Sequence, residues 1–275
     1  TNTLTSKGAK GVVATIPYVT SIPHFTTVPY NPLTVEALGG EAVITQLNTQ
    51  LLGPVKQILT AIGQGSRIQL YSTTNANPLL IRDETLTDVS ATLTAALIAN
   101  NVPAQQAAAI GQVFGQARHA SQNDLFVLGT SSVIGKASAM PAPFDKLGVT
   151  FALEDKYVLI PSEQREIKTA TDKFNDAIWA AARSKKLAVA DMNAIMRYLT
   201  GGIRLGDGQW YTADYFKGTA NMNKVLFSLD GVHPNPRGYA FVANEIVKVI
   251  NEHYKAQLPM LVPGNYPGVT IKASN

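Results

Sequence analysis

The sequence predicts an α/β fold in which helices cover both faces of a parallel sheet, giving a three-layer α/β/α sandwich. Short apolar segments, the first of them β-branched, alternate with longer segments of helical periodicity. Such segments, apolar on both faces, are typical of strands in a parallel sheet. The strand signal is found at residues 11–16, 125–128 and 187–190.

The first predicted strand, residues 11–16, reads Gly-Val-Val-Ala-Thr-Ile and ends at Pro17. A proline-rich loop follows, and loops after parallel strands are common places for functional residues. His24 lies in this loop. We expect it to be a polar loop residue, with a substrate contact as the alternative.

A mostly helical insertion is predicted at about residues 43–124, within a single domain spanning residues 1–275. Apolar spacing indicates a helix over residues 43–62, kinked at Gly53-Pro54. Residues 67–72 and 78–82 resemble the two strands of a small hairpin. Alanine-rich segments at residues 88–100 and 103–119 predict two further helices.

The remainder of the chain returns to the α/β pattern. Ser162 is a candidate N-cap for a long amphipathic helix, and Asp191 is expected to end the strand 187–190 or to cap the next helix. Asn235 and Pro236 are good first residues for the last helix. The expected buried stripes are Ile167, Ala170, Phe174, Ala177, Ile178 and Ala181 in the long helix, and Tyr239, Val242, Ala243, Ile246, Val249 and Ile250 in the last helix.

Composition narrows the class of protein. Hydrophobic residues make up 45% of the 275 residues and charged residues 15%, which favours a folded globular protein over a disordered one. The chain has no cysteine, so disulfides, thiolate catalysis and cysteine-bound zinc are excluded. The net charge is +4, and the densest basic cluster is at residues 183–186. Its simplest interpretation is compensation of a helix dipole, with nucleic-acid binding as the weaker alternative.

The segment around Asp230 and His233 carries the clearest chemical pattern. Acyl transfer requires a nucleophile, an imidazole that accepts its proton, and a carboxylate that fixes the imidazole tautomer. Here carboxylate and imidazole are three residues apart, with Gly231 between them and Pro234 after them. This spacing predicts a tight loop in which the two side chains are within hydrogen-bond reach.

The block Asp-Gly-Val-His-Pro, followed by Asn-Pro-Arg-Gly-Tyr and a helix, resembles the last motif of the SGNH (GDSL-type) serine hydrolases. The strands at residues 11–16 and 187–190 match the order of strands in that family. The resemblance implies an esterase or lipase with His233 as general base and Asp230 as its orienting carboxylate, and it implies no cofactor or metal. It further suggests an exported protein of the bacterial cell envelope, such as a lipoprotein.

The family's blocks that carry the nucleophilic serine and the oxyanion hole are not found. Ser131 follows an apolar segment and Gly129, but Pro141 and Pro143 follow where a helix is required, so we do not expect it to be the nucleophile. Only about three strands are recognisable as well. We therefore expect the serine and the missing strands to lie upstream of Thr1, on a segment of the same precursor that associates with this chain.

The other histidines and aromatic residues have simpler interpretations. His119 and His253 fall on predicted helices and are expected at the surface, and the four histidines have no metal-ligand spacing. The aromatic cluster before the Asp-His block is expected in the core, or alternatively in the wall of an acyl pocket; it comprises Trp210, Tyr211, Tyr215 and Phe216. A non-catalytic envelope binding or assembly protein with an incomplete SGNH fold is the rival to the esterase hypothesis.

Overall fold

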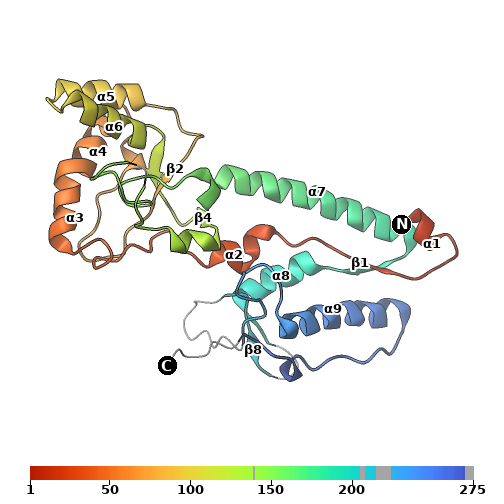
Figure 1. Ribbon diagram of the computed structural model, residues 1–275. Helices are drawn as coiled ribbons and strands as arrows, with labels where there is room; N and C mark the ends of the chain where they lie inside the picture. The colour runs from red at the N-terminus through yellow and green to blue at the C-terminus, as the bar shows by residue number, and fades with distance from the viewer. Residues whose placement is uncertain (139, 205–207, 215–223, 270–275) are drawn as a thin grey trace. The chain divides into compact units, whose positions relative to one another are not determined.

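The computed structural model describes residues 1–138, 140–204, 208–214 and 224–269. The chain forms two compact units, shown in Figure 1. Unit 1 consists of Thr1–Thr27 and Ser162–Asn275, and unit 2 of Val28–Pro161. The chain contains both helices and strands, and two of the strands pair in parallel. It therefore has the α/β character that the sequence predicts.

Unit 1 contains that parallel pair. β1 (Val12–Ala14) lies beside β6 (Ala188–Ala190), with Val13 opposite Val189. The two strands predicted at these positions are confirmed, although both are shorter than expected. β1 is only half-buried, and Ile16 just beyond it is 44% exposed. Within the described residues this sheet has two strands, so β1 has a strand neighbour on one side only.

Three long helices accompany this sheet: α7 (Pro161–Lys185), α8 (Met192–Gly201) and α9 (Pro236–Tyr254). Since α7 begins at Pro161, Ser162 is its second residue and not its N-cap. Asp191 caps α8 by accepting a hydrogen bond from the backbone N–H of Ala194. The shorter elements of the unit are α1 (Asn2–Thr5), η1 (Val19–Ser21), α2 (Pro23–Thr26), β7 (Ile203–Arg204), β8 (Trp210–Tyr211) and η7 (Pro263–Asn265).

The helices of unit 1 do not bury the stripes that periodicity predicts. In α7 the buried residues are Thr171 and Ala182, whereas Phe174 is 58% exposed. In α9 the predicted Tyr239 is 55% exposed, and its predicted aliphatic residues are half-buried. The residues that α9 does bury are Gly238, Ala240, Phe241 and Asn244. The physical reason is that the sheet formed by the described residues, β1 and β6, is too small to cover both helices.

Unit 2 has its own, larger core. Its helical part runs through α3 (Glu41–Leu47), a π-helical turn η2 (Asn48–Leu52), α4 (Gly53–Ala61), α5 (Ser90–Ala99) and α6 (Ala104–Phe114). The π-turn occurs immediately before the predicted kink at Gly53-Pro54. The largest fully buried side chains are Phe114, Phe126, Ile44, Leu52, Leu59, Ile68, Leu79, Leu80, Ile81, Leu93, Leu97 and Leu153.

The strands of unit 2 correct three predictions. β2 (Leu80–Arg82) pairs with β3 (Ala117–His119) and not with residues 67–72. The helix predicted over residues 103–119 therefore ends at Phe114, and its last residues form β3. β4 (Leu125–Phe126) pairs antiparallel with β5 (Val158–Leu159), so the predicted strand 125–128 belongs to this unit and not to the parallel sheet. The remaining short helices are η3 (Gly65–Arg67), η4 (Leu128–Ser132) and η5 (Asp155–Tyr157).

A buried ion network closes the β2–β3 end of unit 2. Arg118 contacts Asp83 at 2.6 Å and Asp124 at 2.7 Å, and the Asp124 carboxylate is fully buried. Burial alone raises the pKa of Asp83, but hydrogen bonds from Thr85 and Arg118 outweigh it and leave this pKa below its usual value. The network thus satisfies its charges internally, as buried ions require.

Candidate active site

The Asp230–His233 loop is a closed turn in unit 1. The backbone N–H of Ser228 donates to the carbonyl of His233 at 2.8 Å, and the N–H of Gly231 donates to the carbonyl of Ser228 at 3.0 Å. Phe227, which precedes the loop, is buried in the unit 1 core. The loop is therefore fixed to packed side chains and is not a free surface segment.

Within this loop the Asp230 carboxylate and the His233 imidazole are joined. Oδ2 of Asp230 lies 2.7 Å from Nδ1 of His233. The other carboxylate oxygen, Oδ1, accepts hydrogen bonds from the backbone N–H groups of Val232 and His233 and from the Ser228 hydroxyl, at 2.9, 3.0 and 2.7 Å. The predicted geometry is confirmed, and every carboxylate oxygen has a donor.

These bonds determine the electrostatics of the pair. The hydrogen bond from His233 is the largest cause of a pKa for Asp230 well below its usual range, and the two backbone donors and Ser228 add to it. An ionised carboxylate at Nδ1 favours the tautomer with its proton on Nδ1. That tautomer leaves a lone pair on Nε2, the nitrogen that can accept a proton.

The Nε2 side of the ring is open. The His233 side chain is 69% exposed and the Asp230 side chain 49% exposed. Within the described part of the chain no atom forms a hydrogen bond with Nε2 of His233. The pair therefore presents a base to the surroundings, positioned by a carboxylate, as a general base requires.

The end of the loop is anchored to α9. The side chain of Asn235, 4% exposed, accepts from the N–H of Gly238 as the N-cap of the helix. Its amide group donates to the carbonyls of Val225 and Phe227 at 2.7 and 3.1 Å. Asn235 thus joins the strand-like entry, the loop and the helix, and Pro236 starts the helix as predicted.

A contact that the sequence did not indicate joins the loop to α2. The backbone N–H of His24 donates to the carbonyl of Gly231 at 2.9 Å, and Nδ1 of His24 lies 3.4 Å from the carbonyl oxygen of Asp230. Gly231 has φ +69°, and a Cβ there would meet the His24 nitrogen at 2.6 Å. A glycine between Asp and His was a signal for such a close approach, but its partner could not be read from the sequence.

The other predicted site residues lie elsewhere. The hydroxyl of Ser131 donates to the carbonyl of Leu128 within η4 of unit 2, and no described imidazole or carboxylate hydrogen-bonds to it. Trp210 is 58% exposed, whereas Tyr211 is buried in the unit 1 core. Tyr215 and Phe216 lie outside the described residues, so the predicted aromatic cluster is described in part.

The two remaining histidines differ in outcome. His253 lies on α9, is exposed and contacts the carbonyl of Lys186 at 3.0 Å, as predicted for a surface residue. The prediction for His119 is wrong: it lies on β3, is 5% exposed, and its Nδ1 accepts the N–H of Gln69 at 2.9 Å. Its Nε2 is buried without a partner, and burial lowers the pKa of His119 to about 3. Pairing of β3 with β2 brings this residue into the core.

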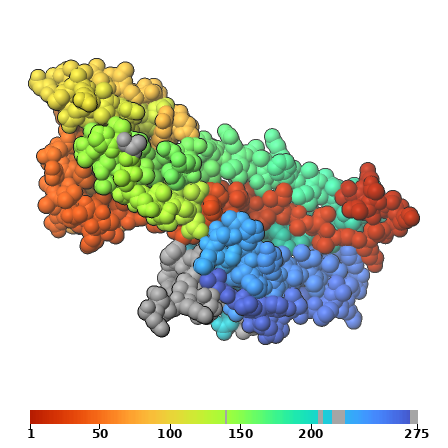
Figure 2. Space-filling model, in the orientation of Figure 1, coloured from red at the N-terminus to blue at the C-terminus, as the bar shows by residue number. Residues whose placement is uncertain are grey.

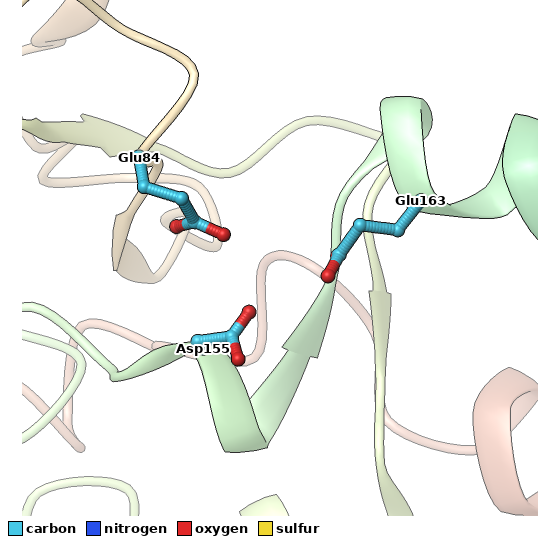
Figure 3. A group of neighbouring side chains, drawn as sticks. All are labelled: Glu84, Asp155 and Glu163. Atoms are coloured by element: carbon cyan, nitrogen blue, oxygen red, sulfur yellow. The ribbon is translucent and has the colours of Figure 1, made fainter.

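Three acidic side chains are the described candidates for metal ligands. Figure 3 draws Glu84 and Asp155, two exposed residues of unit 2, together with Glu163, which belongs to unit 1. Exposed carboxylates are common without an ion, and no further feature marks a ligand there. We assign no metal site to them.

Comparison with models of known families, with curated proteins and with solved structures finds no match for this chain.

Proposed function

We propose that this chain supplies the Asp-His part of the active site of an SGNH-type carboxylic-ester hydrolase. The observation that supports it best is the bond between Asp230 and His233, 2.7 Å long, with the opposite ring nitrogen open. An ionised carboxylate on Nδ1 and a free Nε2 is the arrangement of the imidazole in a serine hydrolase triad.

The proposed reaction follows from these two groups. Nε2 of His233 removes the proton of a serine hydroxyl as that oxygen attacks the ester carbonyl. The resulting imidazolium, stabilised by Asp230, donates the proton to the departing alcohol, which leaves an acyl-enzyme. His233 then activates a water molecule, and the acid is released together with the regenerated serine. These steps use no metal or cofactor.

The serine is proposed to come from a segment outside this sequence, upstream of Thr1 in the same precursor. Ser228 is the serine of the loop, but its hydroxyl is on the carboxylate side, where it contacts Asp230 and the carbonyl of His233. No serine among the described residues hydrogen-bonds to Nε2 of His233. An associating segment that places a hydroxyl there would complete the triad.

The half-covered elements of unit 1 support such an associating segment. An isolated pair of strands is marginally stable at best, and parallel strands are normally paired on both edges and covered on both faces. β1 is paired by described residues on one edge, and Phe174 of α7 and Ile16 after β1 keep large exposed fractions. We propose that the upstream segment adds strands beside β1, which would complete a three-layer sandwich.

The test is hydrolysis of p-nitrophenyl esters by the isolated chain and by the full precursor. The isolated chain should be close to background, and the precursor should be active. In the precursor, His233→Gln should lower kcat about 10⁶-fold and Asp230→Asn about 10⁴-fold. His253→Gln is the matched control, because His253 is an exposed histidine of the same unit, and it should leave kcat unchanged.

Two results would contradict the proposal in different ways. Activity of the isolated chain that disappears with Ser131→Ala would place the nucleophile in unit 2. An inactive precursor would favour the second candidate, a non-catalytic binding or assembly protein. That candidate is favoured by one observation, the lack of a serine partner for His233 among the described residues.

The proposed location is the bacterial cell envelope, after export. It is supported by the composition, in which the charged fraction is only 15% and is replaced by Thr, Asn, Gln, Ser and Ala, as in many exported proteins. Within the described residues no helix has the length and apolar character to cross a membrane. Fractionation of cells expressing the full precursor tests the location, and recovery of the intact precursor in the cytosol would contradict it.

A further inference from the structure

One end of unit 1 gathers cations from three segments that are distant in the sequence. A hollow of about 410 Å³ is lined by Lys10, Lys185 and Lys186, with Thr5, Gly8 and Tyr254 among its other residues. An adjoining hollow shares Lys186 and adds Arg183. Figures 1 and 2 show the N-terminal residues beside the end of α7 at this place. Two further exposed lysines adjoin lining residues in the sequence, Lys7 beside Gly8 and Lys255 beside Tyr254. We define the basic patch as Lys7, Lys10, Arg183, Lys185, Lys186 and Lys255.

Hydrogen bonds hold the three segments together. The Tyr254 hydroxyl accepts from the N–H of Gly11 at 3.1 Å and donates to the carbonyl of Gly11 at 2.7 Å. It also lies 3.4 Å from the carbonyl of Lys186, which His253 contacts at 3.0 Å. The ammonium of Lys10 lies 5.2 Å from the centre of the Tyr254 ring. These contacts fix the backbone segments that carry the basic patch relative to one another.

The charge of the basic patch exceeds what the helices need. α7 and α9 both end here, and each helix C-terminus carries about half a negative charge, roughly one in total. Six cations and one acidic residue of the hollows, Glu252, give the patch a net charge of +5. The whole chain is +4, with 23 basic and 19 acidic residues, so the remainder is −1. None of the six cations has an ion pair within the described residues.

An apolar side chain stands beside this charge. Leu4, on α1, is 79% exposed, and its neighbour Thr5 lines the same hollow as the three lysines. Lysines with a projecting aliphatic side chain fit an anionic bilayer surface, where phosphates pair with the ammonium groups and the apolar group enters the interface. A soluble polyanion such as a nucleic acid offers no apolar phase for an exposed leucine. Base stacking would need an exposed aromatic ring, but Tyr254 is half-buried and its ring already contacts the ammonium of Lys10.

We propose that this basic patch docks unit 1 onto a membrane surface rich in anionic phospholipids. The inference does not depend on the proposed esterase activity, because it uses the end of the unit formed by the starts of β1 and β6 and the ends of α7 and α9, and no residue of the Asp-His loop. It assigns a partner to the cluster at residues 183–186, whose sequence alone indicated compensation of a helix dipole.

The experiment is co-sedimentation of the chain with vesicles of phosphatidylcholine alone or mixed with phosphatidylglycerol. Binding should require phosphatidylglycerol and should weaken strongly between about 0.1 and about 1 M salt, because screening shortens the range of the attraction. The triple variant K10Q/K185Q/K186Q should bind on the order of 100-fold more weakly, at about 1 kcal/mol per lysine. The triple variant K136Q/K146Q/K156Q removes the same charge from unit 2 and should bind normally.

Leu4→Ser separates the membrane from other anions. It should weaken binding to the vesicles but leave binding of a soluble polyanion, heparin, unchanged. Circular dichroism melts of all variants distinguish lost binding from lost folding. Three results would overturn the proposal. The first is equal binding to neutral vesicles, and the second is an equal loss of binding in both triple variants. The third is vesicle binding that Leu4→Ser leaves unchanged and that heparin inhibits by competition.

Discussion

Gly231 is the position where a single methyl group should test how the Asp-His loop is held. Its φ of +69° lies in the left-handed region, which costs an alanine about 1–2 kcal/mol. A Cβ would also lie 2.6 Å from the backbone nitrogen of His24 and 3.0 Å from its Cα. Backbone atoms cannot rotate away, so the loop must move from α2 and lose the bond between the His24 N–H and the Gly231 carbonyl.

The lost hydrogen bond adds about 1 kcal/mol, so Gly231→Ala should lower the free energy of unfolding by about 2–3 kcal/mol. Gly8→Ala is the matched control. Gly8 belongs to the same unit and has a similar φ of +76°, but a Cβ there would have no neighbouring atom within 4 Å. The substitution should cost no more than the backbone contribution, about 1–2 kcal/mol.

Urea unfolding of the isolated chain measures both costs, and side-chain ¹⁵N resonances of His233 measure the position of the ring. Gly231→Ala should shift these resonances, because movement of the loop alters the contact between His233 and Asp230, whereas Gly8→Ala should not. Equal losses of stability in the two variants, with unchanged His233 resonances, would show that the contact with His24 does not hold the loop.

Two further predictions concern unit 2. Burial lowers the pKa of His119 to about 3, so between about pH 6.5 and pH 3 the unfolded chain binds a proton at this residue and the folded chain does not. The free energy of unfolding should therefore fall by about 1.4 kcal/mol per pH unit as the pH drops through this range. Urea midpoints at several pH values should show this slope in the parent and in His253→Gln, and His119→Gln should flatten it. Arg118→Met leaves the carboxylates of Asp83 and Asp124 buried without their partner and should cost about 3–5 kcal/mol in urea unfolding; a loss below about 1 kcal/mol would show that water replaces the guanidinium.

The features that could be predicted from the sequence are those set by neighbouring residues. Asp230 and His233 are three residues apart, so their contact depends on one turn, and the cap at Asn235 depends on its own helix. The β1 and β6 segments were recognisable because both are short and apolar, and β1 is also β-branched. The helix over residues 90–99 followed from composition in the same way.

The features that were missed depend on long-range pairing. Residues 117–119 continue an alanine-rich helical pattern, but hydrogen bonds to β2 outweigh that preference and bring His119 into the core. The contact between His24 and Gly231 joins residues 207 positions apart in the chain. Local periodicity contains no information on either partner, and the same holds for the basic patch, whose three segments meet through the Tyr254 hydroxyl.

The exposure of the Asp-His pair indicates which features of the site this chain supplies and which an associating segment would add. The His233 side chain is 69% and the Asp230 side chain 49% exposed, and a single ion pair contributes little in water because the dielectric constant is high. Their alignment therefore depends on the backbone N–H groups of Val232 and His233, which hold Asp230 before any partner is present. A segment that covers the ring, as proposed above, would exclude water and strengthen the Asp230–His233 bond at the moment it delivered the serine. This chain would then position the general base, and the associating segment would supply both the nucleophilic serine and the exclusion of water. Neither part should hydrolyse esters alone.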